Sequence, residues 1–359
     1  MLPTMRCATA CLLPLTSIVC LIAAGGLGAA RSQATEFIAY GGAGGVSVID
    51  LEGAPVSELP LTGCPAWSPD GGRLAAADTP IGEERLFVAD VQRRALHAVA
   101  RGAMYNHGRP AWSPNGRNLV FNLDGGRLMV ASADGISARV LTKQPVTGRQ
   151  RVHVEDWDPV WSPDGKKIAF TRTRLDVYAE GRPGAATPAD VFVIGANGKG
   201  LRRLVRNASS ASWSPNGREI AYVRAGAGLW VARVDGTDAR QLSARRVLPR
   251  VFELDRRRLF APVWAPDGAA VAFQSFVSNS RRWELFTVKA DGSNERNLTQ
   301  SGANERTPSW APDGNAIVYS RTQRGIKQIY RMNADGKEQR ALTEGGRGGW
   351  FDDCPTWSP

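Results

Sequence analysis

A five-residue phrase, Pro-x-Trp-Ser-Pro or a close variant, recurs seven times along the chain. Successive copies are 45 to 52 residues apart, and their tryptophans are Trp67, Trp112, Trp161, Trp213, Trp264, Trp310 and Trp357. This spacing is the length of one four-stranded blade, so the repeat predicts an all-β chain folded as a β-propeller. Seven equivalent copies are what packing between neighbouring blades needs, and we therefore expect these tryptophans to be structural.

Three apolar runs follow each of the first six phrases. In the unit that starts at Trp264 they are Val271-Ala272-Phe273, a run from Leu285 that ends in Asp-Gly at 291–292, and a short segment that ends in Leu298-Thr299. Short apolar runs bounded by Gly, Pro, Asp and Asn are strand and turn signals. We therefore expect four strands in each unit, with the innermost strand at Pro-x-Trp.

The two ends of the repeat array are complementary. Residues 37–62 contain the second, third and fourth strands of a unit without a first, and residues 355–359 contain a first strand without a second. A terminal strand that completes the first blade would close the ring and remove its open edges. This predicts a seven-bladed propeller closed by the C-terminal strand, with a six-bladed ring of irregular closure as the alternative.

The N-terminal segment has the pattern of a secretory signal. Residues 1–34 have Arg6 as the only early charge, then an apolar stretch to about Ala30, then Ser-Gln-Ala at 32–34. We expect cleavage after Ala34 or Ala30, which leaves the propeller at 35–359 in the periplasm or outside the cell. An uncleaved anchor is the alternative, and no other segment is long and apolar enough to span a membrane.

Two cysteines lie outside the signal segment. Cys64 and Cys354 each precede a Pro-x-Trp-Ser-Pro phrase, and they therefore hold the same position in neighbouring blades. Innermost strands converge on the axis of a propeller, so the two Cα atoms are expected within the range of about 4.4–6.8 Å that a disulfide needs. We predict this bond, with two unpaired buried thiols as the alternative.

The chain is basic, with a formal net charge of +11, and removal of residues 1–34 leaves +9. For an exported protein, this charge favours an anionic polysaccharide, a lipid head group or an acidic protein as partner over nucleic acid. A solvated, arginine-biased surface is the alternative.

Four long connections interrupt the repeat, at 143–158, 173–189, 243–261 and 276–283. All are expected on one face, around blades 4 to 6, where long loops of compact domains are usually functional. Arginine interleaved with aromatic residues is typical of protein-binding or sugar-binding surfaces; loops that only cover the face are the alternative. The candidate binding residues are Arg149, Arg151, His153, Trp157, Tyr178, Arg246, Arg250, Phe252, Arg257, Arg282 and Trp283.

Signals for catalysis are weak. The sequence lacks Gly-x-Ser-x-Gly, His-Glu-x-x-His and Cys-x-x-Cys, and it contains three histidines. His153 with Glu155, Asp156 and Asp158 is the group from which a metal or acid–base site could be built, but its ligand spacing is irregular. We therefore expect no catalytic residues, no metal and no cofactor.

The stretch Pro-Val-Trp-Ser-Pro-Asp-Gly-Lys-Lys-Ile-Ala-Phe at 159–170, followed by the Asp-Gly and Leu-Thr pairs, resembles the TolB-type, WD-like propeller repeat. The resemblance covers residues 36–359 and implies a stand-alone, monomeric envelope propeller without the N-terminal domain of TolB. It implies a non-catalytic scaffold for an envelope protein or an anionic polysaccharide. Oligogalacturonate lyases have a similar repeat and use metal-binding histidines, so a polysaccharide lyase or hydrolase with His153 at the channel mouth is the alternative.

Overall fold

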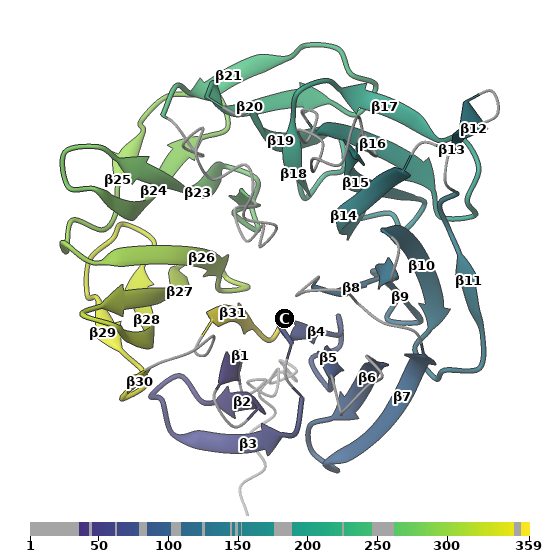
Figure 1. Cartoon of the computed structure of the whole chain (residues 1–359). Helices are drawn as coiled ribbons and strands as arrows, with labels where there is room; N and C mark the ends of the chain where they lie inside the picture. Colours follow the sequence, from purple (N-terminus) through teal and green to yellow (C-terminus); the bar gives the residue numbers. More distant parts are fainter. Residues whose placement is uncertain are drawn as a thin grey trace, which may run out of the picture. The chain divides into compact units, whose positions relative to one another are not determined.

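A computed structural model describes residues 36–42, 45–61, 63–78, 85–101, 109–123, 126–143, 146–147, 150–151, 153–175, 189–224, 226–245, 262–347 and 353–359. These residues form strands and turns, and seven antiparallel sheets are arranged around a ring (Figure 1). In the part of the chain so described, no helix is long and apolar enough to cross a bilayer.

Each sheet is one blade, and its innermost strand contains a repeat tryptophan. Blade 1 contains β1 (Ile38–Gly42), β2 (Gly45–Ile49), β3 (Pro55–Leu59) and β31 (Asp353–Trp357). Blade 2 contains β4 (Ala66–Trp67), β5 (Arg73–Asp78), β6 (Arg85–Asp90) and β7 (Ala95–Arg101). Blade 3 contains β8 (Ala111–Trp112), β9 (Asn118–Leu123), β10 (Arg127–Ser132) and β11 (Ala138–Val140).

The remaining blades follow in chain order. A short hairpin, β12 (Val146–Thr147) and β13 (Gln150–Arg151), precedes blade 4, which contains β14 (His153–Trp161), β15 (Lys167–Leu175), β16 (Asp190–Gly195) and β17 (Arg202–Val205). Blade 5 contains β18 (Ser209–Trp213), β19 (Glu219–Arg224), β20 (Gly228–Arg233) and β21 (Arg240–Ser243). Blade 6 contains β22 (Val263–Trp264), β23 (Ala270–Val277), β24 (Arg282–Lys289) and β25 (Arg296–Asn297). Blade 7 contains β26 (Asn304–Trp310), β27 (Ala316–Gln323), β28 (Ile326–Asn333), β29 (Arg340–Ala341) and the extra strand β30 (Gly346–Arg347).

The C-terminal strand closes the ring. β31 is antiparallel to β1, with Ile38 opposite Trp357, and the backbone N–H of Ser358 donates to the carbonyl of Phe37 at 2.8 Å. The predicted seven blades and their closure by the last strand are confirmed, and the six-bladed alternative is wrong. This closure leaves blade 1 without an open inner edge.

The repeat tryptophans connect neighbouring blades. Six of the seven indole N–H groups donate to a carbonyl in the innermost strand of the preceding blade, at 2.9–3.3 Å; an example is Trp112 to Ala66. The seventh, on Trp357, has no partner among the described residues. Burial of a large ring with a satisfied N–H is the usual role of tryptophan in a core, so the structural role predicted for these residues is confirmed.

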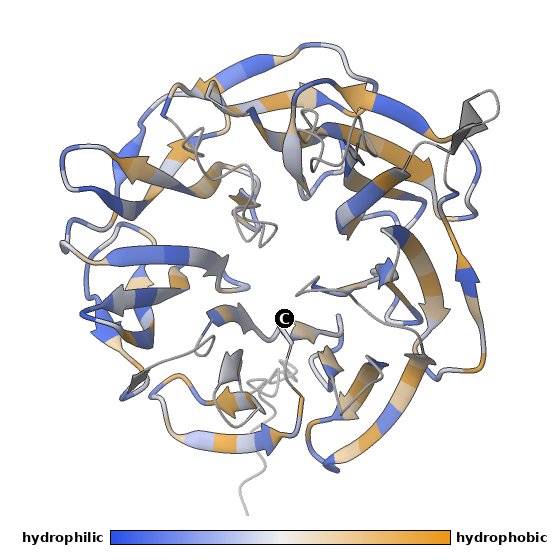
Figure 2. Cartoon of the chain, in the orientation of Figure 1, coloured by the Kyte–Doolittle hydropathy of each residue, from blue (hydrophilic) through white to orange (hydrophobic). Residues whose placement is uncertain are grey.

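The core consists of the layers between blades. One cluster joins blade 4 to blade 5 and includes Ala169, Val193, Trp213 and Tyr222. The strands alternate between apolar and polar residues where they reach the surface, as the stripes on β7 and β3 show in Figure 2. Neighbouring blades therefore bury apolar side chains on both faces of each sheet.

Pro-Asp-Gly or Pro-Asn-Gly turns join the first two strands in blades 2 to 7. In blade 4 the Ser162 hydroxyl donates to Asp164 at 2.6 Å and the Lys166 N–H donates to the same carboxylate at 3.0 Å. These bonds, the first being the larger effect, hold the pKa of Asp164 below its usual value. Blade 5 has Asn216 at this position, with the same two bonds from Ser214 and Arg218.

Three of the connections expected as loops are partly strands. β14 begins at His153 and pairs with β15 as far as Leu175, and β23 pairs with β24 up to Val277 opposite Arg282. The expectation of loops is therefore wrong at 146–147, 150–151, 153–158, 173–175, 276–277 and 282–283. The strands continue because the extended hairpins bury Trp157 and Trp283, which are 8% and 4% exposed.

Candidate functional site

The face at which the innermost strands begin and the second strands end is here called the insertion face. The residue three places before each repeat tryptophan lies within an innermost strand or just before it, and the innermost strands surround the axis (Figure 1). In blades 1 to 5 and 7 these residues are Cys354, Cys64, Arg109, Asp158, Ser210 and Thr307, and the equivalent Ala261 lies outside the described residues. The region around the axis where the six described positions lie is here called the mouth of the ring.

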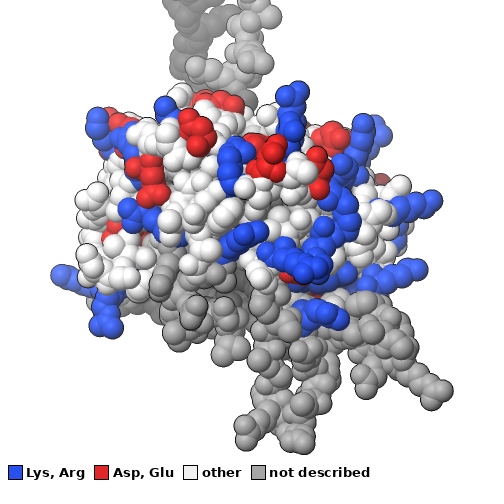
Figure 3. All heavy atoms as spheres, turned by 90° about the horizontal axis from the view of Figure 1, so that it is seen from above, with Lys and Arg blue, Asp and Glu red and all other residues white. Residues whose placement is uncertain are grey.

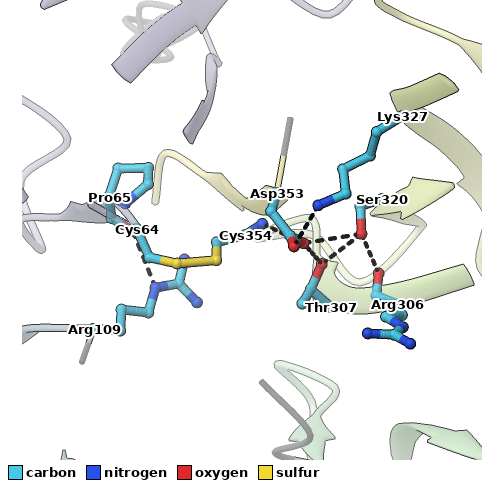
Figure 4. The surroundings of a disulfide bond; sticks show 9 residues. All are labelled: Cys64, Pro65, Arg109, Arg306, Thr307, Ser320, Lys327, Asp353 and Cys354. Atoms are coloured by element: carbon cyan, nitrogen blue, oxygen red, sulfur yellow. Dashed lines mark hydrogen bonds and ion pairs between the residues drawn. A yellow bond between two sulfur atoms is a disulfide. The ribbon is translucent and has the colours of Figure 1, made fainter. Parts of the chain in front are cut away.

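At this mouth the structure joins Cys64 to Cys354 by a disulfide, with the Cα atoms 5.5 Å apart (Figure 4). The guanidinium of Arg109 lies beside the disulfide, and its Nε donates to the carbonyl of Pro65 at 3.0 Å. Desolvation by the surrounding protein lowers the pKa of Arg109 to about 10. Arg109 therefore remains a cation at neutral pH, and it forms no ion pair with a described residue.

Asp353 holds the closing strand against blade 7. Its carboxylate accepts from the Lys327 ammonium at 3.0 Å, from the Ser320 hydroxyl at 3.1 Å and from the Thr307 hydroxyl at 3.3 Å (Figure 4). The innermost strand of blade 1 is thus held on one side by a disulfide and on the other by a carboxylate with three donors. Asp353 is consequently a structural acid.

A second feature of the insertion face recurs in blades 4, 5 and 7. In each of these blades an arginine at the end of the second strand lies over two aromatic rings, one from the second strand and one from the third. The three sets are Arg172 over Phe170 and Phe192, Arg224 over Tyr222 and Trp230, and Arg321 over Tyr319 and Tyr330, with centroid distances of 4.1–5.8 Å. This arrangement favours the cation through the negative face of each ring.

In blades 4 and 7 an acid on the innermost strand neutralises this arginine. Asp156 accepts from Nε and from Nη2 of Arg172 at 2.6 and 2.8 Å, and Glu305 accepts from Nε of Arg321 at 3.1 Å. Asp156 is 1% exposed, and burial raises its pKa although the guanidinium bonds oppose the shift. Burial also raises the pKa of Glu305, which is opposed by the Ser301 hydroxyl and by Arg321.

Blade 5 lacks the acid. Ala208 precedes Trp213 by five residues, as Asp156 precedes Trp161 and Glu305 precedes Trp310. The Nε atom of Arg224 is buried without a partner, and Arg224 forms no ion pair with a described residue. Arg224 is thus the member of this set whose charge the described chain does not neutralise.

Three of the candidate binding residues have described side chains. Trp157 and Trp283 are buried within the extended hairpins and therefore do not present their rings to solvent, whereas Arg282 is exposed and donates to the carbonyl of Gly302 at 3.1 Å. For Arg151 and His153 the backbone alone is described, in β13 and β14. Arg149, Tyr178, Arg246, Arg250, Phe252 and Arg257 lie outside the described residues.

The sequence analysis missed Arg109 and Arg224. Both occupy fixed positions of the repeat, three residues before and eleven residues after a repeat tryptophan. A comparison of these positions across the seven units would have found them, because they differ in charge between blades.

The described surface carries many basic groups. Lys and Arg side chains are spread over the view in Figure 3, with Asp and Glu side chains among them. Within the described ranges no three His, Cys, Asp or Glu side chains are grouped so that they could hold a metal ion. Basic side chains, and not a cluster of metal-binding side chains, thus characterise the described surface.

Comparisons with known proteins agree with this architecture. The family model of the TolB beta propeller domain matches residues 57–247 and 195–359. The Tol-Pal system protein TolB of Francisella tularensis subsp. mediasiatica is 22% identical over 280 residues, which is 76% of this chain and 59% of that protein. The chain therefore spans somewhat more than half the length of this relative.

Solved structures share the fold at low identity. TolB from Acinetobacter baumannii is 16% identical, with a TM-score of 0.53 over 90% of this chain and 66% of that chain. An oligogalacturonate lyase in complex with manganese is 14% identical, with a TM-score of 0.57 over 85% of this chain and 83% of that chain. Likeness at this level of identity concerns the fold. With a family match over most of its length, the chain belongs to the TolB β-propeller family.

Proposed function

We propose that this protein is an exported, non-catalytic scaffold that binds an acidic protein or an anionic glycan through the insertion face around blades 4 to 6. The observation that carries the proposal is the set of cations without an ionic partner on this face. Arg224 of blade 5 and Arg282 of blade 6 form no ion pair with any described residue, and neither does Arg109 of the adjacent blade 3. An unneutralised positive field attracts anionic ligands and speeds their association.

Some cations elsewhere on the surface are neutralised by a described acid: on the opposite face Arg73 pairs with Asp70 at 3.2 Å, and on the outer strands Arg240 pairs with Glu219 at 2.6 Å. The insertion face combines neutralised cations, such as Arg172 and Arg321, with cations that no described acid neutralises. The similarity to the Tol-Pal system protein TolB supports an assignment to an envelope assembly.

The test compares the full chain with a variant in which residues 176–188 and 246–261 are replaced by short glycine-containing turns. Residues 153–158 are kept, because they belong to β14 and contain the buried Asp156. Each protein is immobilised and exposed to the native envelope fraction and to a panel of anionic polysaccharides. We expect a specific ligand on the intact protein and its loss from the variant.

The control is a variant shortened on the opposite face, at the Asp235-Gly236 turn between β20 and β21. Circular dichroism and thermal unfolding verify that both variants fold. A ligand that binds all three proteins equally contradicts the proposed face, and no ligand on the intact protein contradicts the scaffold.

An enzyme that acts on polysaccharide is the second candidate function. It is favoured by the shared fold of the manganese-bound oligogalacturonate lyase. Incubation with anionic polysaccharides, followed by assays for new reducing ends and unsaturated products, separates it from the scaffold. Turnover that disappears in His153→Ala would replace the scaffold proposal, and we expect none.

A further inference from the structure

The arginine that lies over two aromatic rings in blades 4, 5 and 7, together with these rings and the acceptors of the arginine, is here called the arginine-over-aromatic unit. In blade 5 this unit differs in two places. Ala208 replaces the acid that is Asp156 in blade 4 and Glu305 in blade 7. In blade 7 the Gln339 side chain accepts from Arg321 at 2.6 Å and from the Tyr319 hydroxyl at 3.2 Å. Gln339 is the fourth residue after Asp335, and the equivalent fourth residue after Asp235 in blade 5 is Ala239. Both acceptors of the unit are thus alanine in blade 5.

The loss of these acceptors leaves polar atoms without partners. Tyr222 is 0% exposed and its hydroxyl has no hydrogen-bond partner among the described residues, and the Nε atom of Arg224 is buried in the same condition. An unsatisfied buried polar group typically costs about 1–3 kcal/mol. The described residues of blade 5 thus include the arginine and the tyrosine hydroxyl but no acceptor for them, which leaves the place of the acceptor to another molecule.

The unit lies at the junction of blades 4 and 5. Tyr222 packs in the cluster that also contains Ala169 of β15, and Thr171 of β15 accepts from the Ser210 N–H of β18 at 2.9 Å. Thr173 is two residues further along β15 and hence on the same side of that strand. The Thr173 hydroxyl is also buried, and it has no hydrogen-bond partner among the described residues. Unsatisfied polar atoms therefore lie on both the blade 4 side and the blade 5 side of this junction.

We propose that Arg224 binds the carboxylate of an acidic side chain, Asp or Glu, from a protein partner, which takes the role that Asp156 and Glu305 have in blades 4 and 7. This inference rests on the proposed scaffold function and names the chemistry of its partner. Arg224 is half-buried, so part of its side chain reaches solvent, and its guanidinium carbon lies 5.8 Å and 4.6 Å from the ring centroids of Tyr222 and Trp230. A guanidinium can donate to both oxygens of a carboxylate, as Arg172 donates to Asp156, and an acidic side chain is more slender than the ring of a sugar acid.

The first test uses propionate, the analogue of the glutamate side chain, with the full chain at constant ionic strength. The Nε–H resonance of Arg224, identified by its loss in Arg224→Gln, is followed by NMR during the titration. We expect this resonance to shift while that of Arg321 stays unchanged, because Glu305 already occupies the equivalent position. No shift of the Arg224 resonance, or equal shifts of both, would overturn the proposal.

Two variants make the test specific. Ala208→Asp supplies the acid within the chain, and we expect it to lower the affinity for propionate by about tenfold or more without removing Arg224. Arg224→Gln is expected to have the same effect by removing the cation. Undiminished binding by either folded variant contradicts the site, and Arg224→Gln decides alone if Ala208→Asp does not fold.

The source of the carboxylate is tested separately with a short glutamate-rich peptide and with galacturonate at equal concentrations. Stronger binding of the peptide, lost in Ala208→Asp, supports a protein partner. Binding of galacturonate by a protein that binds neither propionate nor the peptide overturns the proposal of a protein partner. If loop shortening abolishes envelope capture while Ala208→Asp leaves capture unchanged, the scaffold function stands and this inference fails.

Discussion

Blade 4 and blade 5 are built from the same repeat and show where a propeller can vary. Each places an arginine over two aromatic rings at the insertion face. In blade 4 the arginine meets Asp156 at 2.6 Å, and in blade 5 Ala208 stands at the position of the acid. In blade 4 the arginine is neutralised within the fold, whereas in blade 5 Arg224 is left to bind a ligand. The replacement of one acid by alanine at a repeat position thus changes the role of the arginine beside it.

Both blades belong to a ring in which the Cys64–Cys354 disulfide joins blade 1 to blade 2. We expect removal of this bond to have the largest effect on the free energy of unfolding. The disulfide joins residues 290 apart in sequence, and loop-entropy arithmetic assigns such a bond about 5–6 kcal/mol. We expect Cys64→Ser with Cys354→Ser to lower the free energy of unfolding by an amount of this order, measured by urea denaturation. Identical peptide maps with and without reductant would show that the bond does not form.

The next effect distinguishes the two blades directly. Asp156→Ala leaves a buried guanidinium unpaired, and we expect it to lower the free energy of unfolding by about 3–5 kcal/mol. Arg224→Met in blade 5 removes no ion pair, and we expect a change of about 1 kcal/mol or less, from the lost contact with Trp230. Equal losses in the two variants would show that the arginines have the same structural role.

The tyrosine hydroxyls sharpen the comparison between blade 5 and blade 7. Tyr319→Phe removes bonds to Gln339 and Arg321, at 3.2 and 3.1 Å, and should cost about 1 kcal/mol. Tyr222→Phe removes a buried hydroxyl that has no partner, so stability should stay the same or rise. A loss in Tyr222→Phe equal to that in Tyr319→Phe would indicate a partner for this hydroxyl.

The smallest effect concerns the turns of blades 4 and 5 and depends on pH. The pKa of Asp164 is lowered from 3.8 in the folded state, chiefly by the Ser162 hydroxyl. Its contribution is therefore present above pH 3.8 and lost as pH falls through the lower folded value. Asp164→Asn, which copies Asn216, should reduce stability by less than about 0.5 kcal/mol at neutral pH because the carboxylate is exposed.

Thermal unfolding of Asp164→Asn and the unaltered protein between pH 2 and 7 measures this difference. The two curves should converge below the folded pKa of Asp164. A difference that persists unchanged at the lowest pH would show that charge is not its cause.

The sequence was sufficient to predict the propeller fold because the same phrase recurs seven times at the spacing of one blade. The spacing of Trp67 to Trp357 predicted the blades, and the incomplete units at the two ends predicted closure by the last strand. Local signals failed at the extended hairpins of blades 4 and 6. Asp156 lies in a stretch that the sequence analysis predicted as a loop, and it is a strand residue because it pairs with Arg172 of β15.

By itself, then, the sequence determined the fold, the number of blades and the equivalent positions of Cys64 and Cys354, because these follow from local periodicity. The tertiary structure alone decided which charges are neutralised. Asp156 and Arg172 are 16 residues apart in the chain and meet because β14 and β15 pair in one register, while Arg224 meets Ala208 in the corresponding place. Neutralisation of a charge depends on which side chains adjacent strands bring together, and it is at this level that blade 5 differs from its neighbours.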